Sequence, residues 1–344
     1  MSAERTADLM PVVRLAPAKI NLTLAVVGRR DDGFHDLHSV FVPLELADRL
    51  SLAPAGAGAA AADDTLHVAG PDCGPVATNL VLRGIAAARA TVGEGPGKPG
   101  TPPLAARLEK RIPVAAGLGG GSSDGAAAFE GALEAWGVPD DLVDEERRRG
   151  AAAWIGSDVP FFLVDGPALV EGRGERVTRL TGIHGHPGIL LVTPRIPVRT
   201  PDVFAVYDGL RGGSRGDGAV RMTSEHLAQE LGNGLPAHQF LSRAGVLAAA
   251  NDLLAAAITV APDLVPFRRA LTRTLNRPIG LSGSGPTLWT LYPSLDEAHT
   301  AATTVEAAVA DGTIPSIGDG PPSVIATTMR TQSRPDAPEE EHRP

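Results

Sequence analysis

The chain has 344 residues, of which 43% are hydrophobic and 21% are charged, a globular composition with enough length for two domains that each bury a core. Its formal net charge of -9 argues against binding to nucleic acid, because proteins that bind duplexes carry a basic face. Its single cysteine excludes an internal disulfide and a cysteine-rich metal site.

No stretch of about eighteen apolar residues occurs, so no membrane-spanning helix is expected. Residues 1–10 contain acidic side chains and lack the apolar core of a signal peptide. These features predict a cytoplasmic protein without a membrane partner, and we expect a monomer or a weak dimer.

Two strands are expected near the N-terminus, at residues 12–15 and 19–27. In the second, apolar residues occupy every even position from 20 to 26, which leaves Lys19, Asn21 and Thr23 together on the opposite face. Polar side chains from one strand are therefore expected to point the same way.

Strands, helices and Gly/Pro-rich loops alternate through the rest of the N-terminal half. Pro43, inside a strand expected at 39–52, indicates an edge or a bulge, because proline cannot donate to a sheet. Residues 54–64 are expected to form a hairpin tip that leads into a return strand at 66–68. The remaining elements expected here are helices at 79–90, 122–136 and 140–155, a strand at 104–112, and a β-hairpin from 161–164 to a strand that starts at 168.

From about residue 188 the expected order of elements is β-α-β-β-α-β, the plan of a ferredoxin-like domain. Strands are expected at 189–193, 278–282, 287–292 and 323–328, with helices over most of 201–276 and from 294 to about 311. Ser294 and Glu297 form the capping box of the last helix. We therefore expect an α+β protein with domains at 1–183 and 184–330 and a disordered tail at 331–344.

A glycine-rich loop leads into the helix expected at 122–136. Four glycines between residues 117 and 121 precede Ser122, Ser123 and Asp124, which are expected to cap that helix. Free N–H groups and the helix dipole at such a junction favour a phosphate. The alternative is a tight structural turn. The loop contains no lysine and is not a Walker P-loop, so a positive charge must come from another segment.

Lys19, the glycine-rich loop and Asp158 together are the parts that a phosphoryl transfer needs. The loop positions the donor, Asp158 accepts or orients the proton of the acceptor hydroxyl, and Lys19 balances the developing charge. The alternatives are a solvent-exposed strand lysine and an aspartate that caps a turn. Spacing in the sequence does not show whether these residues meet.

Four motifs between about residue 15 and residue 292 resemble the superfamily of galactokinase, homoserine kinase, mevalonate kinase and phosphomevalonate kinase. They are PAKINL at 17–22 with GRR and DGFH within 28–35, PVAAGLGGGSS at 113–123, GSDVPFF at 156–162, and LSGSGPT at 281–287, and NDL at 251–253 also fits. The first two motifs are most similar to the branch that acts on cytidine diphospho-methylerythritol.

The resemblance implies a ribosomal-protein-S5-like N-terminal domain and a ferredoxin-like C-terminal domain, with the active site between them. It implies that ATP donates its γ-phosphate to the 2-hydroxyl of cytidine diphospho-methylerythritol, with Mg²⁺ accompanying the nucleotide. The sequence offers no obvious carboxylate pair for a protein-bound metal.

The resemblance also assigns residues. Lys19 and Asp158 match the catalytic pair. ATP is expected to bind Pro113, Val114, Ala115, Ala116, Gly117, Leu118, Gly119, Gly120, Gly121, Ser122 and Ser123. The second substrate is expected to bind Asn21, Phe34, His35, Thr200, Phe204, Gly283 and Ser284.

Phe34 and Phe204 are expected to stack on the two faces of the cytosine, and His35 to read its edge. Phe34 stands where the family often has tyrosine, so a hydroxyl hydrogen bond is lost. The alternative is that both phenylalanines anchor the core and that His35 is a loop residue satisfied by the backbone. Asp124-Gly125 and the long segments at 54–64 and 92–103 also depart from the family pattern.

Two rival functions remain open. Another kinase of the superfamily, such as homoserine or mevalonate kinase, would share the glycine-rich loop but not the Gly-Phe-His segment at 33–35. A non-catalytic binding module on the same fold would have no need to keep Lys19, Asp158 and the glycine-rich loop together.

Overall fold

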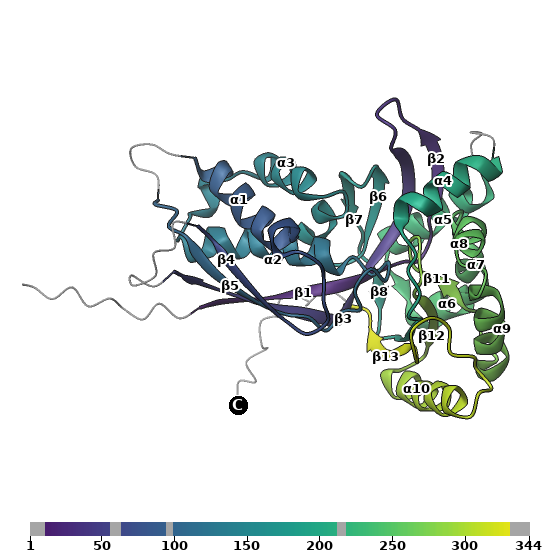
Figure 1. The fold of residues 1–344 in the computed structure, drawn as a ribbon. Helices are drawn as coiled ribbons and strands as arrows, with labels where there is room; N and C mark the ends of the chain where they lie inside the picture. The colour runs from purple at the N-terminus through teal and green to yellow at the C-terminus, as the bar shows by residue number, and fades with distance from the viewer. Residues whose placement is uncertain (1–10, 56–62, 94–98, 212–217, 331–344) are drawn as a thin grey trace, which may run out of the picture.

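A computed structural model of the chain describes residues 11–55, 63–93, 99–211 and 218–330. The expected tail at 331–344, and most of the expected hairpin tip at 54–64, lie outside these residues. The model contains a seven-stranded sheet and a four-stranded sheet (Figure 1). The two sheets meet along the long strand β3 (His35–Pro54). In the described part of the chain, no helix is both long enough and apolar enough to span a membrane.

The seven-stranded sheet is built around β3 (His35–Pro54), which pairs with four other strands. Its remaining strands are β1 (Val12–Asn21), β2 (Ala25–Arg29), β4 (Thr65–Ala69), β5 (Leu104–Glu109), β6 (Ala168–Gly172) and β7 (Arg176–Arg179). The register between β1 and β3 shifts between Pro17 and Lys19, and Lys19 lies opposite Pro43. The bulge predicted from Pro43 is therefore confirmed.

Three helices cover one face of this sheet (Figure 1). They are α1 (Leu80–Val92), α2 (Gly120–Ala135) and α3 (Glu145–Ile155), and their apolar sides form one core with the strands below. The helix expected from residue 79 is confirmed, and Asn79 is its N-cap, since its side chain accepts a hydrogen bond from the Val81 amide. The predicted helix at 140–155 is interrupted: a 3-10 turn at Asp140–Leu142 comes first, and Asp144 caps α3.

Three predictions in this half were wrong. The strand at 66–68 does not return along β3, because β4 pairs in parallel with β5, which separates it from β3. The segment expected to open a β-hairpin is a 3-10 helix, Val159–Leu163, with Pro160 in its first turn, where a missing N–H costs nothing. The strand expected at 19–27 is divided between β1 and β2, so Ile20 and Leu22 pack in one core cluster and Leu24 and Val26 in another.

The β-α-β-β-α-β order of the C-terminal half is confirmed. Its sheet has the order β11-β12-β9-β13, with all neighbours antiparallel: β9 (Gly188–Thr193), β11 (Gly280–Leu281), β12 (Leu288–Tyr292) and β13 (Ser323–Thr328). The helices are α4 (Thr200–Arg211), α5 (Ala219–Gly232), α6 (Ala237–Ser242), α7 (Ala244–Ala249), α8 (Leu254–Val260), α9 (Leu264–Leu275) and α10 (Leu295–Ala310). The predicted capping box of α10 forms, because Ser294 Oγ accepts from the Glu297 amide. Two short strands, β8 (Ile183–His184) and β10 (Leu235–Pro236), form a separate parallel pair.

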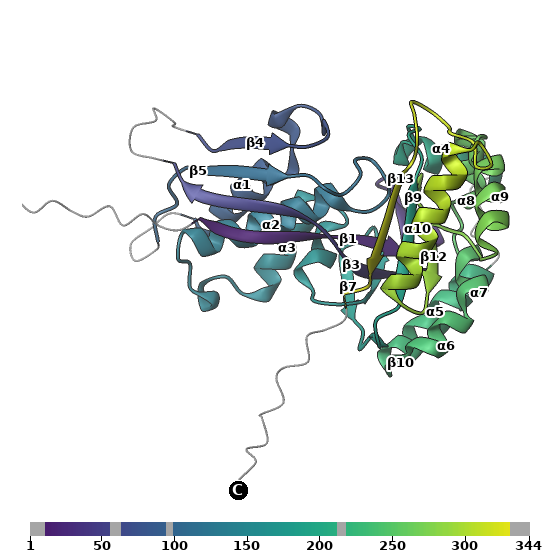
Figure 2. The ribbon, with the colours of Figure 1, turned by 90° about the horizontal axis from the view of Figure 1, so that it is seen from below.

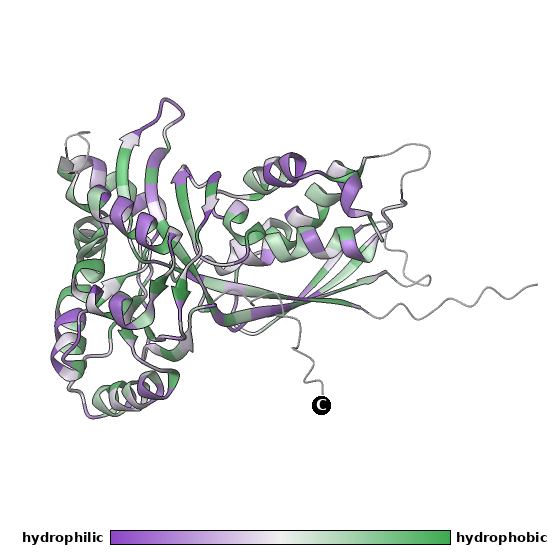
Figure 3. Ribbon diagram, turned by 180° about the vertical axis from the view of Figure 1, so that it is seen from behind, coloured by the Kyte–Doolittle hydropathy of each residue, from purple (hydrophilic) through white to green (hydrophobic). Residues whose placement is uncertain are grey.

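The two sheets share a core where β13 lies between β3 and α10 (Figure 2). The Leu46 amide donates to Thr327 Oγ1 at 3.1 Å, and Leu44 forms a bridge with Met329. One buried cluster combines Ile20 and Val42 of the first sheet with Trp289 of the second. Figure 3 shows that the strands at this junction are largely hydrophobic. The polar residues of the candidate site lie above this shared core.

Candidate active site

Lys19 is buried on β1, with only 4% of its surface exposed. Its Nζ donates to Asn21 Oδ1 at 2.7 Å and lies 4.5 Å from the centre of the Phe41 ring. The neighbouring Ala18 and Ile20 point into the apolar core, so alternation along the strand turns the lysine to the other face. A solvent-exposed role for Lys19, one of the alternatives left open by the sequence, is therefore wrong.

Asp158 faces Lys19 across the site, with 3.6 Å between Oδ2 and Nζ. The lysine side chain is 5% exposed and the aspartate 33% exposed, so the carboxylate is the partner that solvent or a ligand can reach. Asp158 immediately precedes the 3-10 helix, yet its side chain makes no capping hydrogen bond to it. Burial lowers the pKa of Lys19, and the charge of Asp158 opposes that effect.

The glycine-rich loop ends at the N-terminus of α2, which begins at Gly120 with Gly119 as its N-cap. Ser122, Ser123 and Asp124 therefore lie inside the helix, and the prediction that they cap it was wrong. The helix starts earlier because Gly119, with φ 70°, is already its N-cap. A Cβ added at Gly119 would lie 2.9 Å from Lys19 Cγ and from Phe162 Cζ. Only glycine lets the loop approach Lys19 this closely.

Three successive carbonyl groups of the loop accept hydrogen bonds from two other segments. The carbonyl oxygens of Ala116, Gly117 and Leu118 accept from Thr287 N at 3.3 Å, Ser282 Oγ at 2.9 Å and Lys19 N at 2.9 Å, respectively. The loop is thus fixed between β1 and the turn that joins β11 to β12.

Two cavities open on opposite sides of the loop, and both are lined by Gly117 and Gly119. The first, which we call the donor cavity, has a volume of about 330 Å³ and is bounded by the start of α1 and the start of α2. The second, the acceptor cavity, has a volume of about 230 Å³ and contains Lys19, Asn21 and Asp158. A group bound against the loop would be within reach of both.

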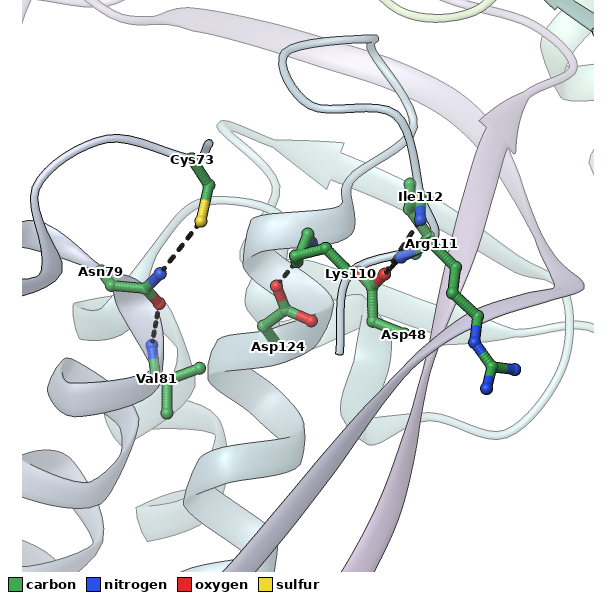
Figure 4. A network of polar contacts seen from close by, with 8 residues as sticks. All are labelled: Asp48, Cys73, Asn79, Val81, Lys110, Arg111, Ile112 and Asp124. Atoms are coloured by element: carbon green, nitrogen blue, oxygen red, sulfur yellow. Dashed lines mark hydrogen bonds and ion pairs between the residues drawn. The ribbon is translucent and has the colours of Figure 1, made fainter. Parts of the chain in front are cut away.

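The donor cavity contains most of the residues expected to bind ATP. Its lining from the loop is Pro113, Val114, Ala115, Ala116, Gly117, Gly119, Gly120, Gly121 and Ser122. Leu118 and Ser123 are instead buried, and the Ser123 hydroxyl has no hydrogen-bond partner in the described structure. Asn79 and Cys73 border the cavity on the side of α1, with 3.7 Å between Asn79 Nδ2 and Cys73 Sγ (Figure 4).

A buried cluster beneath the loop was missed in the sequence. Lys110 Nζ donates to Asp48 Oδ2 at 2.5 Å and to Asp124 Oδ2 at 2.7 Å, and Asp48 Oδ1 also accepts from the Ile112 amide (Figure 4). Burial and the neighbouring Asp48 raise the pKa of Asp124 to about 7, and Lys110 opposes this rise. A lysine between the end of β5 and the glycine-rich loop was the available signal.

The acceptor cavity is closed on its far side by the C-terminal half. Thr200, Phe204, Gly283 and Ser284, which the resemblance assigns to the second substrate, all line it. Thr200 and Ser284 share a 2.8 Å hydrogen bond between their hydroxyls. Asn251 Nδ2 donates to the carbonyl oxygens of Leu281 and Gly283, which fixes the turn that carries Ser284.

The aromatic residues are arranged differently from the expected pair of rings. The ring that lies against Phe204 is His35, so these two rings leave no space for a base between them. Phe34 is 49% exposed, and the Arg173 guanidinium lies 5.5 Å from its ring centre. His35 Nε2 lies 2.7 Å from Asp208 Oδ1 of α4, a partner that the sequence did not reveal. The core-anchor alternative for Phe34 is wrong, since half of its surface faces solvent.

Comparison with known proteins connects this geometry to a family. A family model described as the GHMP kinases N terminal domain matches residues 79–166, which include α1, the glycine-rich loop and Asp158. A 4-diphosphocytidyl-2-C-methyl-D-erythritol kinase from Rhodopseudomonas palustris is 39% identical over 288 residues, covering 83% of this chain and 90% of the relative. The chain belongs to the 4-diphosphocytidyl-2-C-methyl-D-erythritol kinase family. A family member from Deinococcus radiodurans is 36% identical over 298 residues, covering 85% and 88% of the two chains.

Solved structures agree with this family and with the GHMP kinase fold. A crystal structure of 4-(cytidine 5'-diphospho)-2C-methyl-D-erythritol kinase superposes with a TM-score of 0.65 and 29% identity, covering 92% of this chain and 98% of that one. A homoserine kinase from Cytophaga hutchinsonii gives a TM-score of 0.64 with 14% identity, covering 96% and 98%, and shows the fold alone. The family is one of ATP-dependent kinases, so this chain is a kinase with ATP as its phosphoryl donor.

Proposed function

We propose that this kinase transfers the γ-phosphate of ATP to the 2-hydroxyl of 4-diphosphocytidyl-2-C-methyl-D-erythritol, a step of the non-mevalonate isoprenoid pathway. The observation that carries the proposal is the pair of cavities that share Gly117 and Gly119. A nucleotide in the donor cavity would place its last phosphate against these glycines. The acceptor hydroxyl would approach from the side of Lys19 and Asp158.

The donor side suits a chain of phosphates. The N-terminus of α2 provides unpaired N–H groups and the positive end of the helix dipole. Ser122 of the first turn lines the donor cavity, whereas the hydroxyl of Ser123 is buried in the same turn without a hydrogen-bond partner in the described structure. We assign the residues from Pro113 to Ser123 to nucleotide binding on this basis.

Lys19 and Asp158 would act on the acceptor hydroxyl. A lysine ammonium has three donors; one is used by Asn21 Oδ1, one faces Asp158, and the third is available for an oxygen of the transferred phosphoryl group. Asp158 is exposed enough to accept the hydroxyl proton as the oxygen attacks, or to hold that proton in line. Charge balance by Lys19 lowers the barrier, because negative charge grows on the phosphoryl oxygens.

His35 and Phe204 would recognise the cytosine. A carboxylate only accepts hydrogen bonds, so Asp208 requires the proton of His35 to be on Nε2, which leaves Nδ1 of the neutral ring as an acceptor. An acceptor of this kind matches the amino group of cytosine. Phe34, whose side chain is half exposed, would supply a ring for stacking.

Mg²⁺ is expected to enter with the nucleotide. Among the described residues no group of three His, Cys, Asp or Glu side chains could hold a metal ion. We propose that the ion is carried mainly by phosphate oxygens and water, with the Ser122 side chain at the wall of the donor cavity. When bound, the ion would neutralise charge on the phosphates.

We also propose domain boundaries near 183 and 330, since the first sheet ends with β7 and the second begins with β9. A monomer or a weak dimer remains our expectation for the oligomeric state, and sedimentation velocity would test it.

A coupled ADP-release assay tests the substrate. The panel would contain 4-diphosphocytidyl-2-C-methyl-D-erythritol, the same polyol without the cytidylyl group, homoserine and mevalonate, each with and without Mg²⁺. We expect turnover with the cytidylyl substrate alone and only with Mg²⁺. Turnover of homoserine or mevalonate in its place would show that the acceptor is assigned wrongly.

A further inference from the structure

A line of buried hydrogen bonds leads from Lys19 into the protein. Lys19 Nζ donates to Asn21 Oδ1 at 2.7 Å, and Asn21 Nδ2 donates to Ser39 Oγ at 3.0 Å. Ser39 Oγ in turn donates to the backbone carbonyl of Thr23. Asn21 is 3% exposed and Ser39 is fully buried. Solvent therefore cannot replace a partner that is lost from this line.

In every hydrogen bond of this line, the chemistry fixes which atom donates and which accepts. An ammonium group only donates and a carbonyl only accepts, so both ends are fixed by chemistry. Because the Ser39 proton is used by the Thr23 carbonyl, its oxygen must accept from the Asn21 amide nitrogen. The amide oxygen of Asn21 is then the atom that faces Lys19.

The far end of the line is held by the C-terminal half of the protein. Thr23 Oγ1 lies 2.7 Å from Ser224 Oγ of α5 and accepts from the Val40 amide at 3.1 Å. Ser224 also lies 2.9 Å from His38 Nδ1. These bonds fix the backbone at Thr23, and with it the carbonyl that orients Ser39.

We propose that Ser39 is a positioning residue: its hydroxyl fixes the orientation of the Asn21 amide and thereby directs the Lys19 ammonium toward the acceptor cavity. The role of Lys19 in catalysis rests on the function proposed above. The hydrogen-bond geometry does not depend on it.

Removal of the Ser39 hydroxyl would leave the Asn21 amide nitrogen buried without an acceptor. The terminal torsion of an asparagine has a broad, nearly two-fold potential, so the amide can then turn and present nitrogen to the ammonium. Two donors would face each other, and Lys19 would retain only Asp158 as a charged partner. Loss of an acceptor destabilises the charged form, so the pKa of Lys19 would fall.

Three variants separate positioning from a general loss of packing. Ser39→Ala removes the hydroxyl, Ser39→Thr restores it, and Thr327→Ala removes another buried hydroxyl, one that bonds to the Leu46 amide and to no member of this line. Thermal unfolding of all three reports how much of any effect is loss of stability.

The titration of Lys19 gives a readout that does not require activity. The chain has three lysines, Lys19, Lys98 and Lys110, so lysine-labelled protein gives few NMR signals to assign. We expect the pKa of Lys19 to be lower in Ser39→Ala than in the wild type, and to be unchanged in Thr327→Ala and restored in Ser39→Thr. An unchanged Lys19 titration in Ser39→Ala overturns the proposal.

Turnover is the second readout. We expect kcat of Ser39→Ala to fall about tenfold, the loss of one buried hydrogen bond, while KM for ATP stays within about twofold. The alkaline limb of kcat should move to lower pH. An equal loss in Thr327→Ala would assign the effect to packing and overturn the proposal. A wild type that phosphorylates none of the polyols would refute the proposed function, and the Lys19 titration would still decide the role of Ser39.

Discussion

The imidazole ring of His35 lies against the phenyl ring of Phe204, with 4.7 Å between the ring centres and 20° between the ring planes. The two rings come from β3 and α4, and Phe204 lines the acceptor cavity. Asp208, one turn further along α4, holds His35 by its Nε2 atom at 2.7 Å and also faces Arg29 at 3.4 Å. The surface proposed to recognise cytosine is thus held in place by one carboxylate.

We predict that Asp208→Ala weakens binding of the cytidylyl substrate. Without the carboxylate, neither the proton position nor the orientation of the His35 ring is fixed, so KM for that substrate should rise about tenfold. KM for ATP should stay unchanged. Asp202→Ala, an exposed change on the same helix, is the matched control. Steady-state kinetics with each substrate varied in turn would measure both constants, and a parallel rise in KM for ATP would contradict the prediction.

Phe34→Ala should also raise KM for the cytidylyl substrate and leave ATP binding intact. Its ring is 49% exposed, so the change should cost little stability, while a stacked base would lose a contact worth about 1–3 kcal/mol. Leu210→Ala removes a side chain of similar exposure (57%) on α4 and serves as the control. Isothermal titration with each ligand separates the two effects. Equal losses for ATP and the cytidylyl substrate would rule out a stacking role.

Asp158→Asn should lower kcat by about two or more orders of magnitude, the usual contribution of a positioned acid-base group. ATP binding should be nearly unchanged, because the donor cavity does not include this residue. Asp165→Asn, a change at an exposed aspartate on the following turn, should have no effect. Single-turnover measurements would show whether the chemical step is the one that slows. Normal turnover by Asp158→Asn would remove Asp158 from the mechanism.

Gly119→Ala should abolish most activity, because its Cβ would lie 2.9 Å from Lys19 Cγ and Phe162 Cζ and so displace the lysine. Gly137→Ala is the control at the other end of the same helix. It has a similar positive φ of 64°, but no atom lies within 4 Å of the added Cβ. Both variants should lose roughly 1–2 kcal/mol of stability from the left-handed backbone. Only Gly119→Ala should lose kcat; comparable kcat losses in both would implicate backbone strain alone.

The cluster of Lys110, Asp48 and Asp124 should make stability depend on pH. Folding raises the pKa of Asp124 from 3.8 to about 7, so the folded state binds this proton more tightly than the unfolded state does. The resulting stabilisation is complete below pH 3.8 and is lost as the pH rises to about 7. The raised pKa of Lys110 acts only at much higher pH.

Asp124→Asn removes this titration. Urea unfolding between about pH 5 and pH 8 should therefore show a steeper loss of the unfolding free energy in the wild type than in the variant. The exposed change Asp140→Asn should behave like the wild type. Parallel profiles for the wild type and Asp124→Asn would show that Asp124 titrates normally in the folded state.

Local rules in the sequence predicted much of the architecture. Alternation placed Lys19 and Asn21 on one face, Asn79 and Ser294 marked helix starts, and the order of elements identified the ferredoxin-like half. Proline chemistry was read correctly at Pro43 but not at Pro160, where the apolar run looked like a strand.

The residues that were missed all depend on pairing between distant segments. Ser39 reaches Asn21 only because β3 lies beside β1, and Asp208 reaches His35 only because α4 packs across the cavity. Lys110 finds its two carboxylates on β3 and α2. A single sequence shows the polar residue in each case but not the partner that holds it.

The three hydrogen-bonded carbonyl groups of the glycine-rich loop restrict the motion of its backbone. Glycine-rich backbone is normally the most mobile part of a chain, and a ligand that ordered it would lose affinity to entropy. Here Thr287, Ser282 and Lys19 already hold the carbonyls of Ala116, Gly117 and Leu118 before any nucleotide arrives. The loop is preorganised, so the ATP phosphates that we propose to bind there would meet a rigid surface, and their binding energy could go into transfer rather than into ordering the loop.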